Sequence, residues 1–406
     1  MTQLLENEEQ EKTTVENLNH NDLSPDVAAK LKELDELKRE RPSMADWFEL
    51  RLCWWGFVRK NLDEPMPAGV GWWQTLGNLI LTLLVFQFVT GVVLAMYYVP
   101  SPDHAHESVG YISNHLLFGS FIRGIHHYGA SVIVFATVLH ILRVFFWGSY
   151  KKPRELTWVV GVIIFQVILV FSFTGYLLPW DQTAYWATVV GTNITKTVPL
   201  IGSSLRILAL GGNEVGALTL TRFYIIHIMI LPAVLIILTA FHLYLVRRHH
   251  IAGPIVPQKG KPIPFYPVQL LRDVIVVAVG MGIVFILAIF MAPELGPLAD
   301  PSLSNFTPRP EWYFLGLYEL LKLIPRGWEI VGTVIIPVGV TLGMFLLPWL
   351  DRSPSRHPAR RRWIIDLGLV LILIIGVLTL EDILGTPPPD KSVPASATQK
   401  NLILPP

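Results

Sequence analysis

Four histidines lie in two long apolar stretches of the chain, and their spacing is nearly the same in both. His140 follows His126 by fourteen positions, and His242 follows His227 by fifteen positions. In a helix with 3.6 residues per turn, these intervals keep each pair on one broad face, about 21–22 Å apart along the axis. Two such helices facing each other would offer two pairs of imidazoles, one near each surface of a membrane.

Paired imidazoles indicate haem rather than a bare metal ion. A zinc site usually has a third or fourth protein ligand, and no cysteine or acidic residue lies at these depths. Histidine within a membrane-spanning helix is costly and indicates function, although a single one is more often a hydrogen-bonded core residue. Four at matched depths favour two non-covalent b-type haems with axial ligands from His126, His140, His227 and His242.

Glycines repeat the same interval in two other apolar stretches. Gly77 and Gly91 are fourteen positions apart, and so are Gly161 and Gly175. Glycine lets a flat macrocycle approach the helix backbone, so we expect two haem slots in a four-helix bundle. The alternative is that these glycines serve only the packing of one helix on another.

Three arginines near the proposed ligands are candidate partners of the haem propionates: Arg123, Arg143 and Arg222. Haem propionates are anionic and bind such cations; the alternative is that the long side chains only reach the membrane surface. Pro232 follows His227 by five residues and removes a helix hydrogen bond. We expect a local distortion there to absorb the additional residue in the longer histidine interval.

Seven stretches are long and apolar enough to cross a bilayer, which takes about 20 helical residues. They lie near residues 76–98, 124–147, 157–179, 223–246, 273–292, 329–350 and 363–381. Charged residues make up 16% of the 406 residues, against about 25% in soluble domains. The predicted fold is all-α and transmembrane, with a four-helix haem-binding bundle followed by three C-terminal helices.

Composition excludes other classes of protein. A net charge of +1 excludes a broadly basic nucleic-acid-binding protein. The single cysteine, Cys53, excludes an internal disulfide and a CxxCH haem attachment. Fourteen Lys and Arg fall on one side of the predicted spans and seven on the other, so we expect the N-terminus on the cytoplasmic side.

The chain divides into four predicted regions. They are a polar arm (1–43), a four-span dihaem region (44–254), a three-span region (255–385) and a short proline-rich tail (386–406). Leu31, Leu34 and Leu37 predict a short amphipathic helix in the arm, which is either solvated or a docking surface for a partner.

Several strings resemble cytochrome b of the Rieske/cytochrome b quinol-oxidising complexes, and the bf type most of all. They are DWFE at 46–49, KKPRELTW at 151–158, TGYLLPWDQ at 174–182, LTRFY at 220–224 and PEWYF at 310–314. The resemblance implies a low-potential haem on the positive side and a high-potential haem on the negative side. The first would use His126, His227, Gly91 and Gly175, and the second His140, His242, Gly77 and Gly161.

The resemblance also implies quinol oxidation at the PEWY string. A carboxylate such as Glu311 in an apolar pocket has a raised pKa and can accept and pass on a proton, although a loop glutamate taken alone is more often solvated. Tyr313 would order the quinol or a docked Rieske domain by hydrogen bonding. The predicted walls of the quinol pocket are Pro310, Trp312, Tyr176 and Tyr185, and Arg247 marks the negative-side quinone site.

The chain departs from the bf pattern at one position. There a cysteine early in the first span attaches an additional haem, whereas this chain has Thr75, and Cys53 lies well before that position in the sequence. We therefore predict no covalent c-type haem. The chain ends after seven spans, and the residue five positions after the last ligand is Arg247, as in the bf type.

The implied function is that of the dihaem subunit of a quinol:cytochrome c, or equivalent acceptor, oxidoreductase in a bacterial cytoplasmic membrane. Implied partners are a Rieske iron–sulfur protein, a cytochrome c-type subunit, quinol and quinone, and a second copy of the complex. One alternative is a dihaem anchor that connects a soluble dehydrogenase to the quinone pool, which leaves PEWY unexplained. Another is a transporter with a histidine proton relay, which predicts no haem absorbance.

Overall fold

The computed structural model describes residues 43–385 except 257, 303–305 and 307–308, together with residues 29 and 32. Apart from residues 29, 32 and 43, the predicted N-terminal arm, with its helix at Leu31, Leu34 and Leu37, lies outside the described residues. So does the predicted tail at 386–406.

Seven helical spans of the described residues are long and apolar enough to cross a membrane. They are η1–α5 (Trp72–Ala95), α7 (Gly119–Phe146), α8 (Glu155–Tyr176), α11–η2–α12 (Ala217–His249), α13 (Val268–Phe290), η4–α15 (Val331–Leu350) and α16 (Arg362–Gly385). The seven predicted spans and the all-α class are therefore confirmed. Within the described residues, the β structure comprises the two-stranded sheet of β1 (Pro65–Met66) and β2 (Ile263–Pro264) and one isolated bridge.

Short helices fill the longer connections between the spans. They are α6 (Ala105–His115), α9 (Gln182–Lys196), α10 (Gly202–Leu210), η3 (Trp312–Phe314), α14 (Leu315–Leu323) and η5 (Pro358–Arg360). Asp181 begins α9, because its carboxylate accepts a hydrogen bond from the Ala184 amide at 2.8 Å, which satisfies one of the free donors of a helix N-terminus.

The described residues divide into two compact units, one that includes residues 43–65 and 264–267 and one that includes the described parts of 66–263 and 268–385. In the first unit, α3 (Met44–Leu52) and α4 (Trp54–Leu62) meet at Cys53, which is exposed and has a left-handed φ of 47°. A capping box between Ser43 and Asp46 begins α3, as is typical of helix N-termini. The second unit contains all seven spans.

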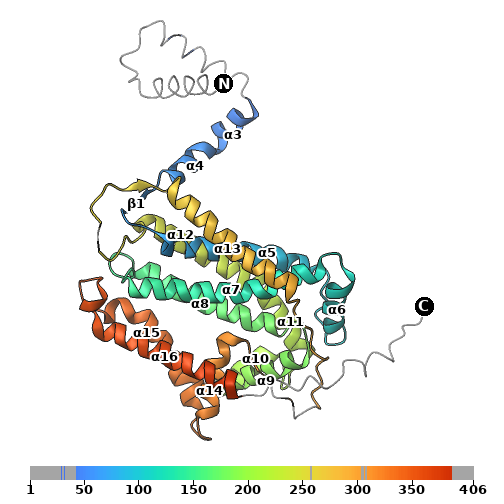
Figure 1. Ribbon diagram of the computed structural model, residues 1–406. Helices are drawn as coiled ribbons and strands as arrows, with labels where there is room; N and C mark the ends of the chain where they lie inside the picture. The colour runs from blue at the N-terminus through green and yellow to red at the C-terminus, as the bar shows by residue number, and fades with distance from the viewer. Residues whose placement is uncertain are drawn as a thin grey trace. The chain divides into compact units, whose positions relative to one another are not determined.

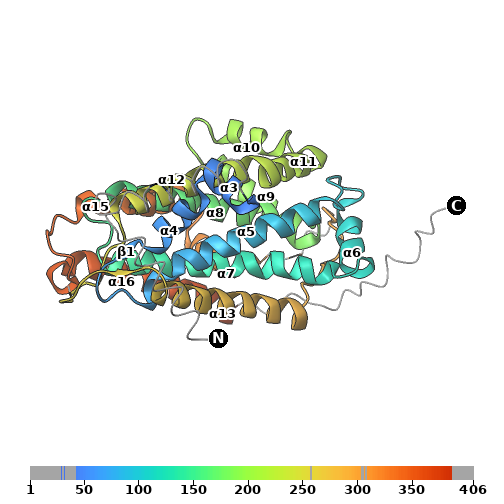
Figure 2. The same cartoon turned by 90° about the horizontal axis from the view of Figure 1, so that it is seen from above.

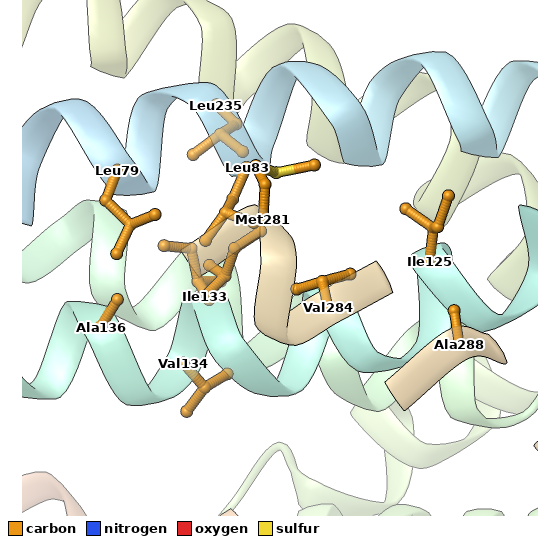
Figure 3. Packing of buried hydrophobic residues seen from close by; sticks show 11 residues of the cluster. Leu79, Leu83, Ile125, Ile133, Val134, Ala136, Leu235, Met281, Val284 and Ala288 are labelled. Atoms are coloured by element: carbon orange, nitrogen blue, oxygen red, sulfur yellow. The ribbon is translucent and has the colours of Figure 1, made fainter. Parts of the chain in front are cut away.

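In the second unit, α7 packs against α5 and α13, and α8 packs against α12 and α15 (Figures 1 and 2). Buried aliphatic side chains fill the space between α5, α7 and α13, as Figure 3 shows for Leu83, Ile133 and Val284. Gly124 of α7 allows close contact with α13, because a Cβ built there would lie 2.8 Å from the Cβ of Ala288. The first helix of the predicted three-span region, α13, thus packs against helices α5 and α7 of the predicted four-span region.

Loops with the same predicted sidedness contact one another. At the basic end, the α7–α8, α12–α13 and α15–α16 connections contact one another. Arg154 donates hydrogen bonds to the carbonyls of His249 and His250, and Arg356 donates to the carbonyls of Trp147 and Gly253. Lys151 forms an ion pair with Asp351. At the other end, the hydroxyl of Tyr98 donates to the Leu178 carbonyl, and Gln182 bonds Asp300. The spans therefore alternate in direction as the charge pattern predicted.

The fourth span contains the local distortion that Pro232 predicted. Its helix changes to a π-helix at Ile226–Ile230, immediately before α12 (Leu231–His249). A π turn closes its hydrogen bonds one residue later than an α turn, so it accommodates one additional residue. The longer interval between His227 and His242 is explained in this way, and the prediction is confirmed.

Candidate functional site

The side chains of His126 and His227 face each other between α7 and the π turn. Their ring centres are 6.3 Å apart and their planes are inclined by 71°. A metal–imidazole bond is about 2.0–2.1 Å long, so two imidazoles on opposite sides of one metal ion have ring centres about 6 Å apart. Within the described part of the chain, no group of three or more His, Cys, Asp and Glu is placed to hold a metal ion. The pair therefore fits haem, because a porphyrin supplies the remaining four ligands.

Two threonines orient these imidazoles. The hydroxyl oxygens of Thr90 and Thr174 lie 3.0 and 3.1 Å from Nδ1 of His126 and His227. Each hydroxyl also donates to the carbonyl four residues earlier in its own helix, at 2.7 and 2.9 Å. Since the hydroxyl hydrogen is used there, Nδ1 of the imidazole is the donor to the hydroxyl oxygen. The other ring nitrogen, Nε2, then carries no hydrogen and is available to a metal.

Neither threonine was predicted, although the sequence contains a signal for both. Each directly precedes a predicted haem-slot glycine, so that a Thr-Gly pair recurs at 90–91 and 174–175. The recurrence indicates a shared task, but the task becomes visible only when the structure pairs α5 with α7 and α8 with α12.

All four glycines that share the same interval lie against histidines. A Cβ built on each would approach an imidazole Cε1: at Gly91 3.1 Å from His126, at Gly175 2.6 Å from His227, at Gly161 3.3 Å from His242 and at Gly77 3.8 Å from His140. We predicted that the space beside each glycine admits a macrocycle. In the structure, the edge of an imidazole occupies part of that space. A side chain at Gly175 would therefore displace the proposed ligand itself, whereas the contact at Gly77 is an ordinary van der Waals distance.

Gly175→Ala tests this packing. A methyl group 2.6 Å from His227 forces the ring to move, so we expect the purified protein to lose about half of its haem. Haem per chain from the absorbance spectrum is the measurement. Gly282→Ala on α13 is the matched control, because nothing lies within 4 Å of a Cβ there, and it should keep the wild-type haem content. Full haem content in Gly175→Ala would refute the role given to this glycine.

The second histidine pair has a buried cation beside it. Arg143 follows His140 by one helical turn and is 7% exposed. One of its nitrogens donates to the Ala252 carbonyl at 3.4 Å, and its Nε has no hydrogen-bond partner. A buried unpaired N–H is destabilising, and an anionic propionate would satisfy it. The imidazole of His242 lies within electrostatic reach of His140, so these two histidines, with Arg143, fit a second haem.

The other two predicted propionate partners have protein partners in the structure. Arg123 donates to the carbonyls of Pro293 and Glu294 at 2.7 and 3.0 Å. Arg222 donates to the Leu208 carbonyl at 2.5 Å. Their contact with propionates stays a prediction.

Glu311 lies at the start of the η3 turn, where it is half-buried. Burial raises the pKa of its carboxyl group above the ordinary value. Three tyrosines lie within its electrostatic reach: Tyr128 of α7, Tyr176 of α8 and Tyr313 of η3. Tyr128 was not predicted, because nothing in the local sequence shows that it lies close to Glu311: Tyr128 is in the second span, and Glu311 follows the fifth.

Two of the tyrosines near the carboxylate are close in sequence to proposed residues of the first haem site. Tyr128 follows His126 by two residues, and Tyr176 follows Gly175 directly. The hydroxyl of Tyr128 donates to the Met291 carbonyl. A group that can accept a proton thus lies near two tyrosines that are one or two positions from a proposed haem ligand and a proposed haem-slot glycine.

Of the remaining predicted residues, some surround Glu311 and others lie elsewhere. Burial raises the pKa of the Tyr313 phenol, which keeps it protonated as a hydrogen-bond donor. Trp312 makes ring contacts with Phe135 and Tyr313, and Pro310 is half-buried beside it. The ring contacts of Tyr185 are with Trp180 and Trp186, and Arg247 is exposed in the last turn of α12.

The position considered for a covalent haem holds a buried threonine. Thr75 is 1% exposed, and its hydroxyl donates to the Trp72 carbonyl at 2.6 Å. The side chain therefore helps to join the η1 turn to α5.

Comparison with known proteins gives matches over both regions of spans. A family model described as Cytochrome b/b6/petB matches residues 61–250, and one described as Cytochrome b(C-terminal)/b6/petD matches residues 298–402. Cytochrome b of Rickettsia prowazekii (strain Madrid E) is 36% identical over 332 residues, which cover 79% of this chain and 81% of that protein.

Two further similarities are to a reductase subunit and to a solved structure. The menaquinol:cytochrome c reductase cytochrome b subunit of Geobacillus thermodenitrificans is 45% identical over 218 residues, or 52% of this chain and 97% of that protein. A solved structure titled "Hyperthermophilic respiratory Complex III" aligns with a TM-score of 0.77 and 30% identity, covering 85% of this chain and 92% of that one. The similarity therefore extends from sequence to fold.

Proposed function

The chain belongs to the cytochrome b/b6 family, and from this membership we propose that it is the cytochrome b subunit of a membrane-bound quinol:cytochrome c oxidoreductase. The observation that carries the proposal is the position of Glu311 beside tyrosines that follow His126 and Gly175 within two residues. Quinol oxidation releases protons and electrons together, so it needs an acceptor for each at one place.

Two non-covalent b-type haems would be held by His126 with His227 and by His140 with His242. When bound, they supply the one-electron chemistry that carries one quinol electron across the membrane, while a Rieske iron–sulfur protein takes the other. Thr90 and Thr174 keep Nδ1 of the first pair protonated and so direct Nε2 toward the metal. Thr75 stands where the covalent attachment of an additional haem would need a cysteine, which supports the proposal that the chain carries no covalent c-type haem.

Glu311 accepts a proton from the quinol hydroxyl. Its raised pKa brings the proton affinity of the carboxylate closer to neutral pH, which favours transfer in both directions. Tyr313 remains a donor and can hold the quinol oxygen, while Pro310, Trp312 and Tyr176 exclude water from the reacting hydroxyl. Protons are released on the side of Glu311 and taken up at the opposite, basic end, where Arg247 marks the quinone-reducing site.

The sidedness and assembly belong to the same proposal. The excess of Lys and Arg at one end of the spans favours that end, and the N-terminus, on the cytoplasmic side of a bacterial cytoplasmic membrane. The partners are the Rieske protein, a cytochrome c-type subunit and a second copy of the complex. Because a relative is named for menaquinol, menaquinol is the quinol we propose first.

Steady-state assay of the purified complex tests this function. We expect reduction of soluble cytochrome c that depends on an added menaquinol analogue. A complex that contains haem and exchanges electrons with quinone, but does not reduce cytochrome c with quinol, would instead support the dehydrogenase anchor.

A further inference from the structure

An acidic side chain is buried near the end of the last spanning helix. Asp382 of α16 is 1% exposed. Its two carboxylate oxygens bind different cations: Oδ2 accepts from Nε of Arg309 at 2.9 Å, and Oδ1 accepts from Nζ of Lys322 at 2.8 Å. A buried carboxylate is tolerated only with such partners, and an ionisable group in a membrane span is a reason to look for function.

Arg309 is fixed by its backbone as well as by its side chain. Its Nη2 donates to the backbone carbonyl of Asp382 at 3.2 Å, and its own carbonyl accepts from the hydroxyl of Tyr176 at 3.3 Å. Pro310 follows, and its ring fixes the backbone φ angle. Glu311 comes next, so few free torsions separate the anchored arginine from the carboxylate.

The second cation, Lys322, follows the turn that carries Glu311, whereas Arg309 precedes it. Lys322 belongs to α14, which continues directly from η3, and it also pairs with Glu319 one turn earlier. The helices α14 and α16 lie side by side (Figure 1), and a Cβ built on Gly316 of α14 would lie 3.1 Å from Oγ1 of Thr379. A single carboxylate therefore holds the segment before Glu311 and the helix after it.

We propose that Asp382 is a positioning residue of the quinol-oxidising site, which holds the turn carrying Glu311 in place through its ion pairs with Arg309 and Lys322. The inference rests on the proposed function of that turn and goes beyond it. It gives the seventh span, which contributes none of the predicted site residues, a direct task in quinol oxidation. The rival explanation is that the ion pairs only stabilise the packing of α16.

Asp382→Asn distinguishes the two explanations. The amide retains the shape but loses the charge that attracts both cations, so we expect the kcat for quinol oxidation to fall about tenfold, because small misplacement of a reacting group is costly. Both haem absorbance bands should remain. Asp366→Asn is the matched control: it is the same substitution in the same helix at an exposed position, and it should leave kcat unchanged.

A double-variant comparison excludes a merely structural effect. If Asp382 acts through Glu311, adding Asp382→Asn to the Glu311→Gln variant should lower its kcat less than twofold. Effects of residues that act as one unit are not additive. An equal, tenfold loss in that background, or wild-type kcat in Asp382→Asn alone, would overturn the proposal. If Asp382→Asn fails to assemble, Arg309→Gln decides by the same comparison, because Lys322 still pairs with the buried carboxylate. Wild-type protein without quinol oxidation would refute the proposed function itself, a different outcome.

Discussion

Replacing His227 by alanine should remove one of two haems and leave the other in place. Among the described residues, His227 is the only one whose imidazole makes a ring contact with His126. The two ring centres are 6.3 Å apart. Without His227, the haem proposed there would lose one of its two histidine ligands. His140 and His242 lie about 20 Å away along their helices, so their site should be unaffected.

Haem per chain measures this effect, and we expect it to fall from two to one with loss of quinol-dependent cytochrome c reduction. His127→Ala is the control, because His127 is adjacent to a proposed ligand but exposed; it should keep both haems. Retention of two haems in the His227 variant would mean that the metal ligands lie elsewhere.

Glu311→Gln should slow quinol oxidation by about 10²–10⁴-fold, the usual contribution of a positioned acid–base group. Glutamine is close in size to glutamate but accepts no proton from a quinol hydroxyl. The absorbance of both haems should be unchanged, because Glu311 is not one of their proposed ligands. Stopped-flow haem reduction by quinol gives the rate of this step directly.

The pH dependence of the rate of quinol oxidation tests the same role of Glu311. Below its pKa the carboxyl group already carries a proton and accepts none, so the wild-type rate should rise with pH. Because burial raises the pKa of Glu311, the rise should lie at higher pH than for an exposed glutamate. Glu311→Gln should lose this dependence. Glu329→Gln, at an exposed position of the same connection, should retain the wild-type rate and profile; equal slowing in both variants would contradict the assignment.

The spans and the paired histidines were predictable because they depend on local periodicity. Apolar stretches of about 20 residues are sufficient to predict membrane helices, and an interval close to four helical turns places two side chains on one face. A local distortion in the fourth span also followed from comparing the longer histidine interval with the position of Pro232, although only the structure shows that it is a π turn at Ile226–Ile230. Each of these conclusions needs only one helix at a time.

The remaining site residues depend on which helices are neighbours, and the spacing of residues does not show this. Asp382 and Arg309 are 73 positions apart, and Tyr128 reaches the surroundings of Glu311 from α7. Their side chains are ordinary for interfacial positions when each is considered alone. The Thr-Gly pairs at 90–91 and 174–175 are an intermediate case, since the repeat was visible but its hydrogen bonds to imidazoles were not.

A redox titration of the visible absorbance of the purified wild-type protein tests the central claim most directly. Two histidine pairs at opposite ends of one bundle predict two b-type haems per chain that titrate as separate one-electron steps, with all haem extracted by acidified solvent. A single haem per chain, or no haem at all, would contradict the assignment of both histidine pairs.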